Sequence, residues 1–163
     1  MSMRLILCAC LLLAMLVPAG ARTLHGTVTH VTDGDSLWVR TATGGEPLQV
    51  RVQGIDAPEI CQVFGVQARD ALAAHLMHQP VEVNTRARDI YHRTVGRVSL
   101  GGQDVGAWMV SRGYAWSPGF RHRPGPYATQ ETEARKARLG LWAQAAPVEP
   151  RSFRKRHGSC KRL

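Results

Sequence analysis

Two common metal-site patterns are missing from this sequence of 163 residues. No Cys-x-x-Cys pair and no His-x-x-x-His pair occurs, so the sequence gives no support for a zinc site. His75 and His78 lie three residues apart on an expected helix, where lone histidines are more often surface or packing residues than ligands. The sequence also has no internal repeat, and its long apolar run, Leu5 to Val17, is shorter than the roughly 20 residues that a membrane-spanning helix needs.

This apolar run has the layout of a secretory signal peptide. Arg4 precedes it, and Pro18 and the small residues Ala19, Gly20 and Ala21 follow it. We therefore expect cleavage after Ala21 and export of the rest of the chain, to a periplasm or out of the cell, without a membrane anchor. A lipoprotein site at Cys10 is a poorer alternative, because too little apolar sequence precedes it.

Cleavage would leave about 140 residues, which fits one compact domain with little room for a second. The whole chain has 21 Lys and Arg against 12 Asp and Glu, a formal net charge of +9, and only Arg4 leaves with the signal peptide. Such a charge favours a polyanionic partner. Solubility is a common alternative explanation, so charge alone does not establish nucleic-acid binding.

Cysteine is scarce in the part of the chain that remains. Cys8 and Cys10 lie in the expected signal peptide, which leaves Cys61 and Cys160. An exported protein with one such pair favours a disulfide between them. Two free thiols are the alternative, because a sequence does not show whether the two Cα atoms come within bonding reach.

The pattern of apolar residues predicts a small mixed β and α domain. Alternation indicates five strands, at residues 25–32, 37–41, 48–53, 81–83 and 94–100. Helical spacing indicates three helices, at residues 64–78, 104–112 and 127–139, with Asp104 as the N-cap of the second. Five strands with one helix inserted suggest a closed barrel, although periodicity alone allows a barrel or a sandwich with helices.

Charged residues gather where the expected strands end. Along strand 48–53 every second residue is apolar, so Arg51 points away from the core. The strand runs into Asp56-Ala57-Pro58-Glu59, where the proline holds two carboxylates apart on a stiff corner. Asp33-Gly34-Asp35-Ser36 forms a second acidic corner. Carboxylates at two strand ends beside an arginine can share a metal ion and a phosphate.

These motifs, together with Asp89-Ile90-Tyr91-His92-Arg93, resemble the staphylococcal nuclease family in their order and spacing. Singly, each is more often a turn or a structural salt bridge, but the complete charged set in family order favours a functional site. The resemblance runs from about Gly26 to Trp142. It implies an α+β fold, an OB-fold five-stranded β-barrel with about three packed α-helices. The domain is expected over residues 22–146, after a signal peptide at 1–21 and before a basic C-terminal tail at 147–163.

The resemblance also implies a metal site and a base. Asp35, Asp56 and the main-chain oxygen of Ala57 match the ligands of a Ca²⁺ ion, and oxygen ligands suit such a hard cation. Glu59 matches the general base that takes a proton from the attacking water. Ala57 and Ser36 stand where the family usually has threonine. Both departures keep the matched group, the main-chain oxygen in one case and the hydroxyl in the other.

Two arginines match the phosphate clamps of the family. They are Arg51 and Arg93, whose planar guanidinium groups can each hold two phosphate oxygens where a lysine would hold one. Tyr91 matches the aromatic residue beside the second clamp. His92 replaces the glycine that is usual before the second arginine.

The residues that stack on nucleic-acid bases are harder to assign. The family places aromatic residues after the second helix, and this sequence has four there: Tyr114, Trp116, Phe120 and Tyr127. Trp116 is the best candidate for stacking, whereas core packing explains Tyr114 at least as well. The basic residues at 121–123 and 151–162 either steer polyanions or form ordinary solvated surface.

In function, the resemblance implies an exported calcium-dependent nuclease. Such an enzyme hydrolyses phosphodiester bonds of DNA and RNA with little sequence specificity and leaves 3′-phosphate ends, and we expect a monomer. The alternative, from a different class, is a catalytically silent OB-fold module that binds nucleic acid or protein. The acidic set is present, which favours the enzyme.

Overall fold

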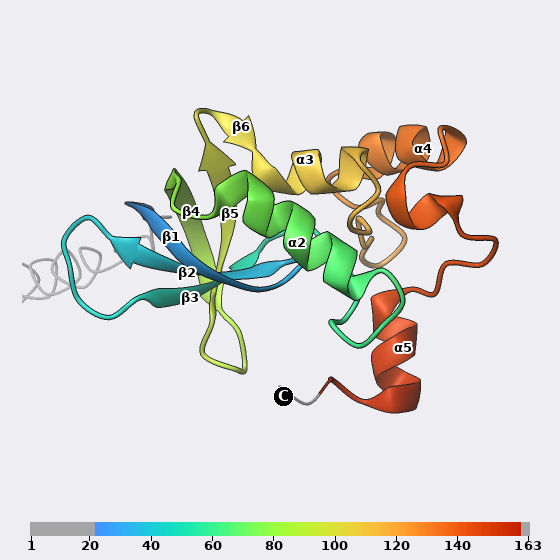
Figure 1. Cartoon of the computed structure of the whole chain (residues 1–163), viewed down its shortest axis with the longest axis horizontal. Helices are drawn as coiled ribbons and strands as arrows, with labels where there is room; N and C mark the ends of the chain where they lie inside the picture. Colours follow the sequence, from blue (N-terminus) through green and yellow to red (C-terminus); the bar gives the residue numbers. More distant parts are fainter. Residues whose placement is uncertain (1–21, 161–163) are drawn as a thin grey trace, which may run out of the picture.

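The computed structural model describes residues 22–160 (Figure 1). The expected signal peptide, residues 1–21, lies outside these residues. A barrel of strands occupies the left of Figure 1, α3 lies near the top centre, α4 lies at the upper right, and α5 lies at the lower right. Within residues 22–160, no helix has both the length and the apolar character needed to cross a membrane.

The sheet closes on itself. Its strands are β1 (Thr23–Asp33), β2 (Ser36–Thr41), β3 (Leu48–Val52), β4 (Pro80–Arg88), β5 (Thr94–Leu100) and the short β6 (Gln103–Asp104). They lie in the order β3-β2-β1-β4-β5-β6, and β3 also pairs with β5. This last pairing is parallel, while the others are antiparallel. The expected α+β class with a five-stranded barrel is therefore confirmed.

Helix α2 (Gly65–Leu76) covers the barrel on one side. It packs along β1, and Ala68, Leu72 and Leu76, which follow helical spacing, are fully buried. Side chains such as Val28 and Val50 meet them from the strands, where alternate residues face inward. The apolar alternation that predicted the strands is thus the pattern that fills the core.

The helices α3 (Val105–Ser111) and α4 (Ala128–Lys136) pack against each other beside the barrel. Asp104 caps α3, because its carboxylate accepts a hydrogen bond of 2.9 Å from the N–H of Ala107, as the sequence predicted. A 3₁₀ turn, η1 (Gly140–Ala143), follows α4. Its residues Leu141 and Trp142 form a second, smaller core with Ala134 of α4.

The expected basic C-terminal tail, residues 147–163, contains a helix that the sequence reasoning did not predict. This fourth helix is α5 (Pro150–His157), which begins at a proline, a residue well suited to the first helical turn. Cys61 and Cys160 form a disulfide whose Cα atoms lie 5.8 Å apart, which confirms the expected bridge. The tail is therefore joined covalently to the corner that carries Glu59.

Tyr127 joins two helices, and its removal gives a prediction about stability. Its hydroxyl donates to the Asp104 carboxylate at 3.0 Å, and burial, reinforced by the Asp104 charge, raises the pKa of Tyr127 from 10.0 to about 12. We expect Tyr127→Phe to lower the free energy of unfolding at pH 7 by about 1–2 kcal/mol, measured by urea denaturation. Tyr91→Phe, at an exposed ring, is the control.

The raised pKa of Tyr127 also determines how its contribution to stability changes at alkaline pH. Below pH 10 the phenol is protonated in both the folded and the unfolded chain. Between about pH 10 and pH 12 the unfolded chain loses this proton first, so the contribution of Tyr127 to stability falls as the pH rises. Tyr127→Phe should lack this component of the decline. An identical alkaline slope in wild type and variant would contradict the assignment.

Candidate active site

Strand pairing brings the two acidic corners together. Ser36, the first residue of β2, pairs with Arg51 on β3, which places the arginine beside Asp35. Gly34 makes the first corner compact, since a Cβ there would lie 2.6 Å from the side chain of Ala57 on the second corner. A larger residue at Gly34 would push the corners apart.

Arg51 bridges two aspartates. Its Nη1 donates to Asp35 Oδ1 at 2.8 Å, and its Nη2 donates to Asp56 Oδ1 at 2.9 Å. Asp56 is held in place by its backbone, which exchanges two hydrogen bonds of 3.0 Å with the backbone of Trp116. Because both aspartates are almost completely buried, the bridge fixes their separation inside the protein.

The pKa of Asp35 is raised by its surroundings. Burial raises the pKa of Asp35 to about 6, while the Arg51 charge and a hydrogen bond of 3.1 Å from the N–H of Ala57 work in the opposite direction. The Asp35 carboxylate therefore lies where additional positive charge would stabilise its ionised form. Buried groups with such shifts occur often at functional sites.

Glu59 lies at the far side of the second corner. Its backbone N–H donates to Gln62 Oε1 at 3.2 Å, and its carbonyl accepts from the N–H of Gln62 at 2.8 Å, which tightens the turn into α2. Its carboxylate Oε1 accepts a hydrogen bond of 2.9 Å from Arg154. The side chain remains 22% exposed, so water can reach the expected base.

Arg93 joins the cluster from the residue just before β5. Its Nε donates to Asp89 at 2.7 Å, and its Nη1 donates to the hydroxyl of Ser36 at 3.2 Å. Burial alone would raise the pKa of Asp89. The hydrogen bonds from Arg93 oppose this effect, and the pKa of Asp89 is lowered from its usual value. The Tyr91 ring lies 5.3 Å from the guanidinium. The loop thus presents the second expected clamp at the same end of the barrel as the first.

His92 shows why this loop favours glycine. Its φ is +62°, in the left-handed region that most side chains disfavour. His92 stands where the family usually has glycine. The turn forms nevertheless, with His92 in the left-handed backbone conformation that glycine adopts most easily. The Asp89 carboxylate accepts hydrogen bonds from the N–H groups of Tyr91 and Arg93, which holds the turn.

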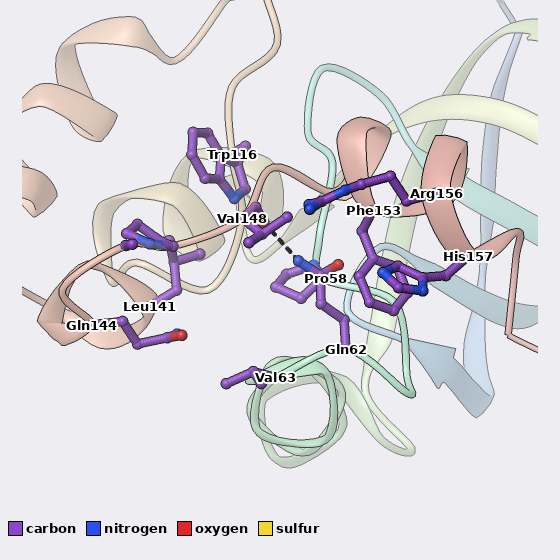
Figure 2. A pocket seen from close by; sticks show the side chains of 12 residues that line it. Pro58, Gln62, Val63, Trp116, Leu141, Gln144, Val148, Phe153, Arg156 and His157 are labelled. Atoms are coloured by element: carbon purple, nitrogen blue, oxygen red, sulfur yellow. Dashed lines mark hydrogen bonds between the residues drawn. The ribbon is translucent and has the colours of Figure 1, made fainter.

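Trp116 lies next to the acidic corner, but its ring is used in packing. The guanidinium of Arg135 lies 4.6 Å from the Trp116 ring centre, and Trp142 contacts it edge-on at 4.4 Å. Trp116 also borders a cavity of about 250 Å³, shown in Figure 2 between Trp116 and the α5 residues Phe153 and His157. Its indole N–H is buried there without a hydrogen-bond partner.

One residue at this site was missed by the sequence reasoning. Arg154 on α5 donates to Asp56 Oδ1 at 3.0 Å, to Asp56 Oδ2 at 2.9 Å and to Glu59 Oε1 at 2.9 Å. The sequence grouped it with a run of basic residues whose role was left open. The only signal that this run returns to the site was Cys160, because its expected partner, Cys61, lies two residues after Glu59.

The acidic groups fit a hard cation. Among residues 22–160, no three His, Cys, Asp or Glu side chains form a ready-made metal cluster. Asp35 and Asp56 supply carboxylate oxygens only, which is the donor chemistry of Ca²⁺, and main-chain, water or phosphate oxygens can complete such a shell. The raised pKa of buried Asp35 favours additional positive charge. The donor atoms are therefore of the right type for this ion, and in this structure arginine side chains occupy both Asp56 oxygens.

Fold and site together define a class: a closed-barrel protein whose strand ends collect carboxylates and arginines suited to phosphodiester hydrolysis. Comparison with known proteins supports this class. The model of the family described as "Staphylococcal nuclease homologue" matches residues 49–144. The chain therefore belongs to the staphylococcal nuclease family, which confirms the resemblance seen in the sequence.

Several relatives cover most of the chain. It is 37% identical over 160 residues to a "Micrococcal nuclease" of Shigella flexneri, a match to 90% of this chain and 89% of the relative. It is 38% identical over 157 residues to "Protein ParB" of Escherichia coli, covering 88% and 87%. An "Uncharacterized endonuclease" of Haemophilus influenzae is 33% identical over 129 residues, covering 78% and 71%. Family and relatives place the chain in the phosphodiesterase class of enzymes.

Proposed function

We propose that this protein is an exported calcium-dependent nuclease that cuts DNA and RNA with little sequence specificity and leaves 3′-phosphate ends. The observation that supports it best is the bridge from Arg51 to Asp35 and Asp56, with Glu59 on the same corner. This arrangement brings an acidic pair, a base and a phosphate-binding arginine together from β3, the turn after it and the corner between β1 and β2. Membership of the nuclease family supports the same function.

The roles follow from the chemistry of each group. Glu59 takes a proton from the attacking water, since a carboxylate oxygen can accept a proton and this side chain is reached by solvent. Arg51 and Arg93 bind the phosphate oxygens: each uses two of its five N–H donors in the contacts described, which leaves three for substrate. Tyr91 is exposed beside Arg93 and borders the substrate path.

Calcium would be held by Asp35, Asp56 and the main-chain oxygen of Ala57. When bound, the ion would add positive charge next to the phosphate and help to orient the water. Asp35 and Asp56 keep the site oxygen-rich, and Arg51 keeps them from repelling each other. Their loop corners suit the longer, adaptable shell of calcium better than the tight octahedron of magnesium.

The substrate and location belong to the same proposal. A net charge of +9 supports binding to DNA and RNA backbones. Phosphate binding by Arg51 and Arg93, with Trp116 as the candidate for stacking, requires no particular base sequence. Export is supported by the signal-peptide layout at residues 1–21. The disulfide fits an oxidising compartment. A monomeric state is part of the same proposal.

An assay of the purified exported protein tests the proposal. Plasmid DNA and RNA should both be cut in calcium, and excess chelator should abolish cutting. Labelling of the product ends should find 3′-phosphate and 5′-hydroxyl groups. Binding without cutting under all metal conditions would favour the silent OB-fold module instead. Purification from the periplasm or medium, with Arg22 at the N-terminus, tests the export.

The metal ligands give a separate prediction. We expect Asp35→Ala and Asp56→Ala each to raise the calcium concentration for half-maximal activity by at least about tenfold, equivalent to ~1.4 kcal/mol. Magnesium should substitute poorly in wild type. Asp70→Ala is the control, because Asp70 is exposed and pairs only with Arg69 among its contacts described here. Unchanged calcium dependence in both site variants, or equal activity in magnesium, would contradict the assigned ligands.

A further inference from the structure

The guanidinium of Arg154 takes up the oxygens that a cation would need. Asp56 Oδ1 accepts from both Arg51 and Arg154, and Asp56 Oδ2 accepts from Arg154. Each carboxylate oxygen has about two lone pairs, so Oδ1 is fully used. Hydrogen bonds to Asp56, stronger than the opposing effect of burial, raise the pKa of Arg154. Arg154 therefore binds Asp56 as a fixed monovalent cation.

The helix that carries Arg154 is weakly packed. Of the residues in α5, only Pro150 is buried. The cavity of about 250 Å³ lies under α5, bordered on the helix side by Phe153, Arg156 and His157 (Figure 2). Few buried apolar contacts and an incompletely filled underside mean that lifting α5 costs little packing energy. The ion pairs of Arg154 are thus a main attachment of the helix.

Two other connections limit how far the helix can move. The disulfide joins Cys160 to Cys61, and Gln62 Nε2 donates to the carbonyl of Val148 at 2.6 Å. One lies just after α5 and the other just before it. When Arg154 leaves the carboxylates it therefore stays close to them, and a tethered group competes at a high effective concentration.

From these contacts we propose that α5 is a built-in gate, in which Arg154 and a divalent cation compete for Asp56 and Glu59 is released as the cation enters. The proposal rests on the proposed calcium site, and it adds a regulatory element that lies outside the residues matched by the family model, 49–144. Only molecules with the gate open bind calcium. The apparent calcium affinity is therefore the affinity of the open form multiplied by the fraction of molecules that are open. Calcium would thus bind to Asp56 and, by displacing Arg154, also free the Glu59 carboxylate.

The test is a direct calcium titration by calorimetry, which does not depend on turnover. Wild type is compared with Arg154→Ala and with Arg151→Ala, a control that removes the same charge from an exposed position of α5. Arg154→Ala should bind calcium about tenfold more tightly. Arg151→Ala should stay within about twofold of wild type. The double variant Cys61→Ser with Cys160→Ser should also bind calcium more tightly, because Arg154 then loses one of its two tethers and competes at a lower effective concentration.

The outcomes separate the gate from the enzyme. If wild type binds calcium and Arg154→Ala binds it equally or less tightly, the gate is wrong and the calcium site stands. If no variant binds calcium, the calcium site and the gate both fall, whatever the nuclease assay gives. Circular dichroism checks that each variant is folded. Hydrogen exchange of wild type supplies a readout without substitution. The amides of residues 151–157 should exchange faster with calcium, and slower or unchanged exchange overturns the gate.

Discussion

The Glu59→Gln variant is expected to lose about 10²–10⁴-fold in kcat, the usual contribution of a general base. Glutamine keeps the size of glutamate and can still accept the hydrogen bond of 2.9 Å that Arg154 donates to Oε1. The amide oxygen is not basic enough to take a proton from water. Folding and KM should therefore change little while turnover falls.

The measurement is initial rate against substrate concentration at saturating calcium, with thermal unfolding in parallel. Glu133→Gln is the matched control, since Glu133 is exposed on α4 and pairs with Lys136. Its kcat should stay within about twofold of wild type, as expected for an exposed surface pair. Wild-type turnover in Glu59→Gln would remove Glu59 from the mechanism. If the variant is instead largely unfolded under the assay conditions, so that the loss of folded protein accounts for the loss of kcat, the role of Glu59 is structural.

Arg51→Lys is expected to lose at least about 10²-fold in kcat, although it keeps the positive charge. Arg51 reaches Asp35 with one nitrogen and Asp56 with another, and its side chain is 24% exposed. Lysine has a single nitrogen, which cannot hold both aspartates at their present positions and face a phosphate as well. The change should also raise the calcium requirement, because the two carboxylates lose their common partner.

Single-turnover rates and calcium titration measure these two effects separately. Arg69→Lys is the control, as Arg69 pairs with Asp70 on the surface of α2. Arg93→Lys should lose activity in the same way, because Arg93 contacts Asp89 and Ser36 through two different nitrogens. Near-normal rates in both site variants would show that two-point binding by the guanidinium is unimportant.

The sequence predicted the parts of the fold that depend on apolar alternation. Strand β5 has the predicted bounds, Thr94–Leu100, and β3 ends one residue earlier than predicted. These strands alternate core residues such as Val50 and Val98 with outward residues, and that alternation is visible in the sequence. The Asp104 cap was visible too, because a cap depends on neighbouring residues only.

Elements that depend on distant partners were predicted less well. Strand β4 extends to Arg88, well beyond the predicted 81–83, because β5 supplies backbone partners for a polar stretch that has no apolar alternation of its own. Helix α4 ends at Lys136, before the predicted Leu139, since Arg138 takes a φ of +52°. Helix α5 was missed because little of it is buried, which leaves no apolar stripe to detect.

In the candidate site too, residues carried by short sequence motifs were predicted, and a residue brought in from a distant part of the chain was not. Its acidic corners and arginines were found because short motifs carry them, and the structure places Asp35, Arg51, Asp56, Glu59 and Arg93 in one cluster. Arg154 lies 98 residues from Asp56 in sequence, and nothing in its basic neighbourhood marks it out. Only the pairing of two cysteines across the chain indicated that the tail returns.

The parallel pairing of β3 with β5 has a consequence for folding. Arg51 lies within the β3 segment and pairs with Val95, while Arg93 immediately precedes β5. Parallel pairs need long connections, and such non-local contacts are slow to form. The two arginines come together only when the barrel closes, so a nascent or partly folded chain has no assembled phosphate site.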